Sequence, residues 1–338
     1  MTRALTAFLV VFGLIAPAFA APPESAGGDD ADTAEAINLL SQASDAVRRE
    51  TYRGVIASLR HGDVDTLKVV HRYHDHKEQE RLVSLTGQAR EIIRKGDKVT
   101  SILPEHKLVL ISEHPPKSLL GSIAHFSAGQ LKANYAVLDQ GKTRSAGRDC
   151  RIVEIRPKDQ FRYGYKMLID AETQLPLKLE LLKDGKRLEQ LMFTDVSFPK
   201  SVPDSEFVSS YDLHGFRVVR HESVHVSEQP SAAAEDRWQA NDLPPGFELA
   251  EDGVRQVTPS ASVRQMLFTD GVATVSAFIA PAGLRAPLKG ATRMGAVNAY
   301  GDIVGNTQIT VVGEVPAITA RRIAENLVRQ DTDLSSGH

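Results

Sequence analysis

The run His221-Glu222-Ser223-Val224-His225 has the residue types and spacing of a zinc protease motif. Such a motif binds one metal ion when a helix places both histidines on the same face, with the glutamate as general base. Here Phe216–Arg220 and Val226 flank the run, and these residues are typical of extended chain. In a strand the two histidines would lie about 13 Å apart, which is too far to share one ion. The pattern argues against a hydrolase, and metal-dependent hydrolysis through His221 and His225 is kept only as a third alternative.

A second group of histidines is His71, His74 and His76. His74 and His76 would share one strand face and His71 would point to the other, which favours a solvated hairpin rim over a metal site. The carboxylates of Glu78 and Glu80 are predicted to be solvated charges on polar faces. The chain has no nucleophile elbow, phosphate loop or dinucleotide fingerprint. We therefore predict no catalytic residue, no cofactor and no metal.

Cys150 is the single cysteine, so the chain cannot form an internal disulfide. It lies in an alternating run, residues 149–155, which predicts a strand and a buried structural thiol. The formal net charge of −3 argues against a general nucleic-acid binder, which would carry a basic excess.

The first 20 residues predict export to the periplasm. Arg3 precedes an apolar run, Ala4–Ile15, and Ala18-Phe19-Ala20 is a pattern that signal peptidase accepts before Ala21. The run is shorter than the roughly 20 residues of a transmembrane helix, and no cysteine follows it for a lipid anchor. We expect a soluble mature protein whose residues 21–31 form a disordered leader.

The rest of the chain predicts two β-rich units. A helix is expected from Asp32, because apolar residues then recur at three- and four-residue spacing. Short turns separate the strands of an antiparallel meander, and Pro115-Pro116 interrupts it before a helical or irregular stretch, 117–135. The first unit covers 32–220, and its expected strands are 52–60, 65–73, 80–86, 90–94, 98–103, 108–111, 150–156, 163–170, 177–183 and 188–198.

Residues 226–240 lose periodicity, so we predict a linker over 221–240. It leads to a smaller unit, 241–330, which a flexible tail, 331–338, follows. In this unit Ile318–Val328 predicts a closing helix, with Pro316 just before it. The expected strands are 263–268, 274–279, 294–299 and 308–312.

The large sheet needs something to cover its apolar face. One interpretation is an open barrel that holds an acyl chain, with residues 117–126 as its lid; the other, which the pattern favours, is ordinary core packing. The candidate groove residues are Leu67, Val69, Tyr73, Val83, Leu85, Leu119, Leu120, Ile123 and Phe126. The candidates for a basic rim that would bind phosphates, with a solvated strand face as the favoured alternative, are Arg81, Arg90, Arg94 and Lys95.

Short runs along the whole chain also share a pattern with one known family. In the first unit these runs are Val83–Gly87, Arg90–Gly96, Gly141–Arg144 through Cys150, Arg162–Tyr165, and Leu175–Leu182 with Leu188–Gln190. In the second they are Trp238–Asn241, Leu243–Phe247, and Val312–Pro316 followed by Thr319–Asn326. Together they resemble the periplasmic sigma-factor regulators RseB and MucB.

This resemblance implies an α+β protein. An N-terminal antiparallel half-barrel with covering helices, similar to the lipoprotein carriers LolA and LolB, would precede a smaller C-terminal antiparallel sheet with a helix. The family binds the periplasmic domain of a transmembrane anti-sigma factor, RseA or MucA, and shields it from proteolysis until lipid or lipopolysaccharide acyl chains release it. We take Trp238, Phe247, Phe268 and Arg293 as candidate partner contacts, and a homo-oligomer is an open option. The alternative function is a periplasmic lipid or lipoprotein carrier that uses the same groove.

Overall fold

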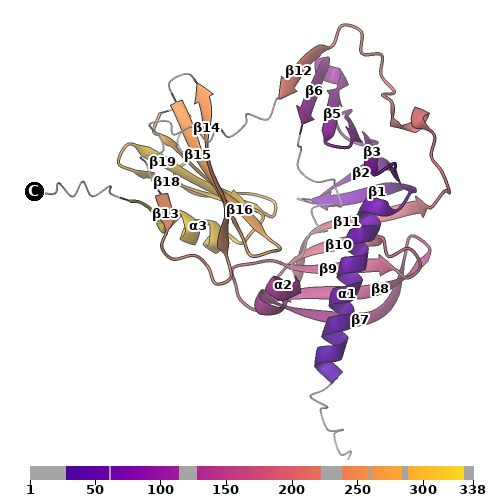
Figure 1. The fold of residues 1–338 in the computed structure, drawn as a ribbon, viewed down its shortest axis with the longest axis horizontal. Coiled ribbons are helices and arrows are strands. Elements are labelled where there is room, and N and C mark those ends of the chain that lie inside the picture. Colours follow the sequence, from indigo (N-terminus) through magenta and orange to yellow (C-terminus); the bar gives the residue numbers. More distant parts are fainter. Residues whose placement is uncertain are drawn as a thin grey trace, which may run out of the picture.

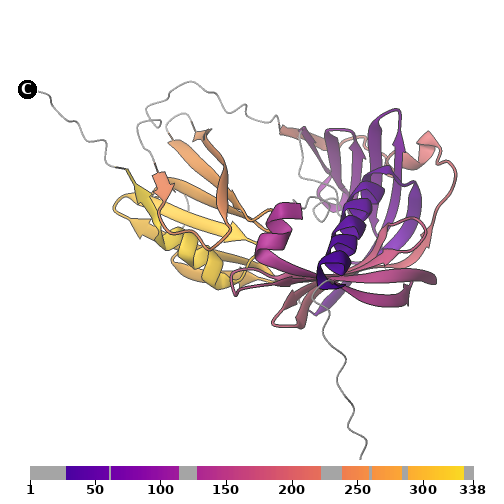
Figure 2. The same ribbon diagram turned by 60° about the horizontal axis from the view of Figure 1, so that its bottom comes forward.

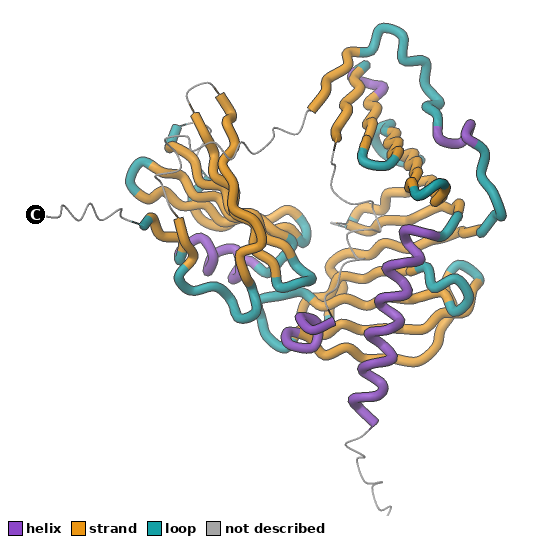
Figure 3. Tube along the Cα trace, in the orientation of Figure 1, coloured by secondary structure: helices purple, strands orange, loops and turns teal. Residues whose placement is uncertain are grey.

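The computed structural model describes residues 28–60, 62–113, 128–221, 238–258, 261–283 and 288–330. These residues form two lobes, each built around its own sheet, and the lobes meet beside α2 (Ala128–Asn134) (Figures 1 and 2). Strands make up most of both lobes and helices are few (Figure 3). None of the described helices has the length and apolarity needed to cross a membrane.

The N-terminal lobe is one 12-stranded sheet, in the order β12-β6-β5-β4-β3-β2-β1-β11-β10-β9-β8-β7. All neighbours pair antiparallel except β12, which runs parallel to β6. The strands are β1 (Tyr52–Arg60), β2 (Asp63–His74), β3 (Lys77–Ser84), β4 (Glu91–Lys95), β5 (Lys98–Leu103), β6 (Leu108–Glu113), β7 (Tyr135–Ser145), β8 (Arg148–Pro157), β9 (Gly164–Asp170), β10 (Pro176–Lys183), β11 (Lys186–Ser197) and β12 (Arg217–His221).

Local sequence explains the tight connections of this meander. Along β1, side chains alternate between buried and half-buried, as expected when one face of a sheet is fully covered. The β10–β11 connection is Asp184-Gly185, and both residues have positive φ, 51° and 72°. A two-residue hairpin needs this geometry to match the strand twist, and Asp184-Gly185 supplies it.

One long helix, α1 (Gly28–Arg49), lies across one face of the sheet (Figures 1 and 2). We call this side the helix face. Near its start the helix buries Ala36 and Leu40 against strands β7 to β9, and near its end it buries Val47 against Tyr52 and Ile56. Helix and sheet together therefore bury the main apolar core of the lobe.

The opposite side, which we call the outer face, is partly covered by the chain that follows β11. A short 3-10 helix, η3 (Asp204–Phe207), packs Phe207 with Val202 against Val70. Arg72 stacks its guanidinium over the Phe207 ring at 4.8 Å. The segment between β11 and β12 is thus part of the fold.

The C-terminal lobe is a six-stranded sheet in the order β14-β15-β16-β19-β18-β17, backed by α3 (Ala317–Glu325). Ile323 and Ala320 of α3 pack on Val275, Val311 and their neighbours in the sheet. A two-stranded ribbon joins the ends of the lobe. The strands are β13 (Trp238–Ala240), β14 (Glu248–Thr258), β15 (Ala261–Thr269), β16 (Thr274–Pro281), β17 (Gly290–Met294), β18 (Val297–Val304), β19 (Thr307–Gly313) and β20 (Leu327–Arg329).

The predicted fold class is confirmed, and the differences are local. Strands β7, β13 and β14 were not predicted, and β13 lies inside the linker expected over 221–240. The strand expected over 294–299 is wrong because a turn at Gly295, with φ of 62°, separates β17 from β18. The closing helix ends at Glu325 rather than Val328. Helix α1 begins at Gly28, inside the leader expected over 21–31. The predicted signal peptide and tail lie outside the described residues.

Candidate functional site

The predicted zinc motif begins at the last residue of β12. His221 pairs with Ser112 in the parallel β12–β6 register, so the chain is extended at this point, as the sequence predicted. His225 lies outside the described residues. Within the described part of the chain, no three His, Cys, Asp or Glu side chains are grouped so that they could hold a metal ion.

The histidines of the β2–β3 hairpin lie in different environments. His74 and His76 are exposed, and His76 has a φ of 60° in the turn. His71 is fully buried on the helix face, where its ring stacks on Tyr52 with a centroid distance of 4.8 Å. The predicted solvated rim is therefore wrong for His71, because the end of α1 covers that part of the strand.

Glu80 also departs from the sequence prediction. Its side chain is only 3% exposed, since it lies opposite His71 in the β2–β3 register. Burial raises the pKa of Glu80 to about 7; the nearby charges of His71 and Arg94 act against this rise, and Glu78 adds to it. The prediction of a solvated charge is wrong here.

The structure does not bring the predicted groove residues together on one face. Val69 is fully buried on the helix face, Leu67 is half-buried there and Tyr73 is exposed. Val69 pairs with Leu82, so Val83 points to the outer face, and Leu85 is exposed just beyond the end of β3. The other four candidates, Leu119, Leu120, Ile123 and Phe126, lie outside the described residues.

The register instead defines an apolar strip on the helix face beyond α1. Leu82 pairs with Ile92, and the same row continues through Ser101 to Leu110 and Val219. From Ile92 onward these side chains are only half-buried among the described residues. We call Ile92, Val99, Leu110 and Val219 the apolar strip. The alternation in residues 98–103 and 108–111 predicted these strands. Which of their side chains share one face could be determined only from the strand register.

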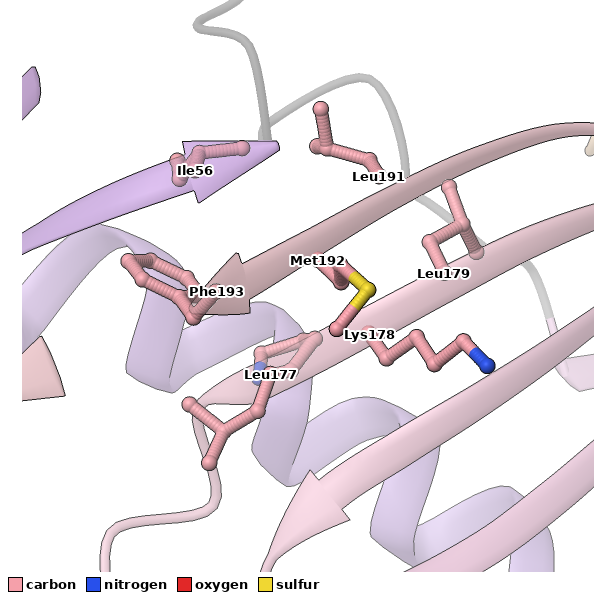
Figure 4. A pocket seen from close by; sticks show the side chains of 8 residues that line it. Ile56, Leu177, Lys178, Leu179, Leu191, Met192 and Phe193 are labelled. Carbon is pink, nitrogen blue, oxygen red and sulfur yellow. The ribbon is translucent and has the colours of Figure 1, made fainter. Parts of the chain in front are cut away.

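Beneath α1 the same face is closed. Ile56, Leu177, Leu179, Leu191 and Phe193 line a hollow between β1, β10 and β11 (Figure 4), which leaves no space for even one water molecule. Three of these side chains are at most 1% exposed. This part of the face is packed core, which is the interpretation that the sequence pattern favoured.

The predicted basic rim divides between the two faces. Arg81 pairs with Val70 and lies on the outer face, where it forms an ion pair with the fully buried Glu91. Arg94 lies on the helix face, 3.9 Å from Glu80. Arg90 and Lys95 are exposed. Two of the four cations are thus held by buried carboxylates on opposite sides, so the four side chains do not form one phosphate-binding rim.

A polar junction connects the lobes, and its centre is Arg162. This side chain is fully buried, with Nε 3.3 Å from the Asp270 carboxylate of the C-terminal lobe and 3.4 Å from Asp159. Its guanidinium also lies 5.4 Å from the Phe247 ring and 5.5 Å from the Tyr135 ring.

Asp270 is equally buried and receives donors from both lobes. The Tyr135 hydroxyl donates to it over 2.8 Å, and the backbone N–H groups of Val272 and Ala273 donate to its other oxygen. Burial, and next the Asp270 charge, raise the pKa of Tyr135, so the hydroxyl keeps its proton. The junction therefore places one buried carboxylate between a cation and a phenol of the other lobe.

Further contacts extend the junction on either side. Thr319 donates to the Phe161 carbonyl over 2.5 Å. The Asn298 amide donates to the Tyr163 hydroxyl over 3.0 Å. The sequence reasoning missed Arg162 as a functional residue, although it begins a run that carried the family resemblance. Residue type and spacing give no sign that Arg162 and Asp270, more than 100 positions apart, meet in one buried pair.

The predicted partner contacts lie mostly in the interior. Trp238, Phe247 and Phe268 are at most 6% exposed and belong to the core of the C-terminal lobe, because large aromatic side chains fill the space between its sheet and α3. Arg293 is exposed on β17, an edge strand. Cys150 is buried, as predicted, and burial raises its thiol pKa to about 11.

Comparison with known proteins agrees with the two-lobe architecture. The family model of the MucB/RseB N-terminal domain matches residues 35–211, and that of the MucB/RseB C-terminal domain matches residues 232–328. The sigma factor AlgU regulatory protein MucB of Pseudomonas aeruginosa is 29% identical over 308 residues, 86% of this chain and 90% of that protein. The sigma-E factor regulatory protein RseB of Haemophilus influenzae is 24% identical over 305 residues, 89% and 93% of the two chains.

Solved structures give the same result. MucB in the Pseudomonas aeruginosa MucA/MucB complex is 26% identical, with a TM-score of 0.67 over 88% of this chain and 99% of that chain. MucB in complex with MucA(peri) has a TM-score of 0.65 with the same identity and coverage. The predicted family is confirmed: the chain belongs to the MucB/RseB family of regulatory binding proteins, which are not enzymes.

Proposed function

We propose that this protein is a periplasmic negative regulator of an envelope-stress sigma factor. It would bind the periplasmic domain of a transmembrane anti-sigma factor and shield that domain from proteolysis. The observation that carries the proposal is similarity over both lobes to MucB, which has been solved in complex with MucA(peri). The predicted signal peptide supports a periplasmic location.

The proposed release signal is a lipid or lipopolysaccharide acyl chain. The apolar strip supports this part, because its half-buried side chains come from neighbouring strands and share the helix face next to packed core. Burying apolar surface contributes about 25 cal/mol per Å², so an acyl chain laid along Ile92, Leu110 and Val219 would gain several kcal/mol. The hollow under α1 has no such space.

We further propose that lipid binding changes the placement of the lobes and so weakens the binding of the anti-sigma factor's periplasmic domain. A ligand shifts such an equilibrium only by its difference in affinity for the two states. The junction supports a change between two placements of the lobes, joined and separated. The buried Arg162–Asp270 pair is stable only when both charges are present, so an arrangement that keeps one of them buried alone is unfavourable. Separating the lobes would expose both groups to water together.

The test is binding of the purified mature protein to the periplasmic segment of its anti-sigma factor, with and without lipopolysaccharide. Tight binding that lipid weakens supports the regulator. The variant Leu110→Asp should keep partner binding but lose the response to lipid, while Val83→Asp, on the outer face, should keep both. Lipid binding without partner binding would favour the carrier function and overturn the proposal.

A further inference from the structure

The helix face carries a buried polar cluster where the end of α1 meets β2, β3 and β4. His71 is fully buried and Glu80 is 3% exposed, while Glu78 is partly buried beside them. Tyr52 stacks on the His71 ring, and Arg94 lies 3.9 Å from Glu80. Burying several ionisable groups in one place is costly unless their protons and charges are matched.

Two contacts fix the orientation of the His71 ring. Its Nδ1 lies 2.7 Å from the carbonyl oxygen of Glu50, the residue that follows α1. A carbonyl only accepts hydrogen bonds, so Nδ1 carries a proton and donates it. The stacked Tyr52 ring keeps the imidazole in this plane. Nε2 is then aimed at Glu78 Oε1, at a distance of 3.4 Å.

In a neutral imidazole with this tautomer, Nε2 is an acceptor. Its neighbour Glu78 Oε1 is also an acceptor, and both atoms are buried without a hydrogen-bond donor among the described residues. Two facing acceptors repel each other, and each is left desolvated. One proton on Nε2 would change this contact into a charge-assisted hydrogen bond.

The charges around His71 come from every element that packs on it. Burial raises the pKa of Glu78, but a protonated His71 that donates to it, together with Arg94 and Arg48, brings this pKa below its ordinary value. Burial raises the pKa of Glu80 to about 7. Burial, and then Glu80 and Glu78, raise the pKa of Tyr52, which stays neutral. Glu78 and Glu80 are thus the acidic groups that act on His71, and Arg94 and Arg48 are the cations near them.

We propose that His71 and Glu78 form a buried proton-binding site that ties the end of α1 to β3 and tightens the helix face as the pH falls through the histidine range. Histidine is the side chain that ordinarily changes charge between about pH 5 and 8. With the proton bound, His71 bonds both Glu50 and Glu78. Without it, only the bond to Glu50 remains.

Glu80 acts in the same direction. A carboxyl group whose folded-state pKa is raised contributes stability that is complete below its ordinary pKa and is lost as the pH rises through its folded value. For Glu80 that loss runs from its ordinary pKa of 4.5 up to about pH 7. Since Ile92 of the apolar strip neighbours Leu82 in this part of the sheet, alkaline conditions should loosen the face at the start of the strip.

The experiment is urea unfolding of the full mature chain between pH 6 and 8, together with ¹⁵N NMR of the histidine rings. The variant Glu78→Gln keeps the size of the side chain but offers an amide donor, so neutral His71 gains a hydrogen bond without a proton. The matched control is His74→Gln, a histidine on the same strand whose side chain is 70% exposed.

In the wild-type protein the equilibrium constant for unfolding should increase as the pH increases. The increase should reach up to about tenfold per pH unit for each proton that the folded state binds and the unfolded state does not. Glu78→Gln should flatten this dependence and be the more stable variant at pH 8, while His74→Gln should follow the wild type. The His71 ring should show a protonated Nε2 at pH 6. Equal pH slopes for wild type and Glu78→Gln, or a neutral His71 ring at pH 6, would overturn the proposal.

Discussion

Replacing Arg162 by Met tests whether the polar junction holds the lobes together. The methionine keeps an apolar stem against Phe247 and Tyr135 but removes the charge, which leaves Asp270 buried without its cation. Removing one partner of a buried ion pair costs about 3–5 kcal/mol. Asp270 keeps its hydrogen bonds from Tyr135, Val272 and Ala273, so we expect a loss near the lower end, about 3 kcal/mol.

A loss of about 3 kcal/mol changes an equilibrium constant by more than 100-fold. If the junction resists separation by a similar amount, the variant should populate separated lobes, and its radius of gyration in X-ray scattering should increase. Urea unfolding should show a lower midpoint or two transitions. The control is Arg321→Met on α3, which removes the exposed ion pair with Glu325 within one lobe. An Arg162→Met protein with wild-type midpoint and scattering would refute this account of the junction.

Three further outcomes are expected. Leu110→Asp should abolish binding of a fluorescent acyl probe that Val83→Asp retains, because the two side chains lie on opposite faces of the sheet; equal loss in both variants would contradict the register argument. Gly246→Ala should lower the free energy of unfolding by at least about 1 kcal/mol, since φ is +76° and the new Cβ would overlap the Asn134 side chain. Cys150 should react with a thiol reagent at pH 8 only after urea unfolding, because burial raises its pKa to about 11; rapid labelling of the folded chain would contradict this.

Local sequence predicted most strands because the turn residues that separate them can be recognised locally. Strand β1 was predicted with its observed ends, since a run with apolar and β-branched residues ends at the turn signal His61-Gly62-Asp63. Strand β7 was missed because its second half, from Asp139 to Ser145, is polar and its pairing with β8 contains a bulge. Tertiary pairing decides such segments, and it cannot be read from their own residues.

The functional positions were harder to predict, because they depend on which face a side chain occupies. Val83 and Val69 look alike in sequence, but the β2–β3 register puts them on opposite faces. His71 and His74 look alike too, and only the position of α1 makes one buried and the other exposed. A one-residue change of register exchanges the two faces of a strand, so sequence alone leaves this choice open.

The buried ion pair between the lobes gives a physical reason why the two lobes can act together. An apolar interface weakens gradually as its surface is exposed, but a buried ion pair fails when either charge is left alone. Arg162 and Asp270 therefore favour two arrangements, fully joined or fully separated, over intermediate ones. A ligand that binds the helix face would need to favour the separated state by only a few kcal/mol to change partner affinity by more than 100-fold.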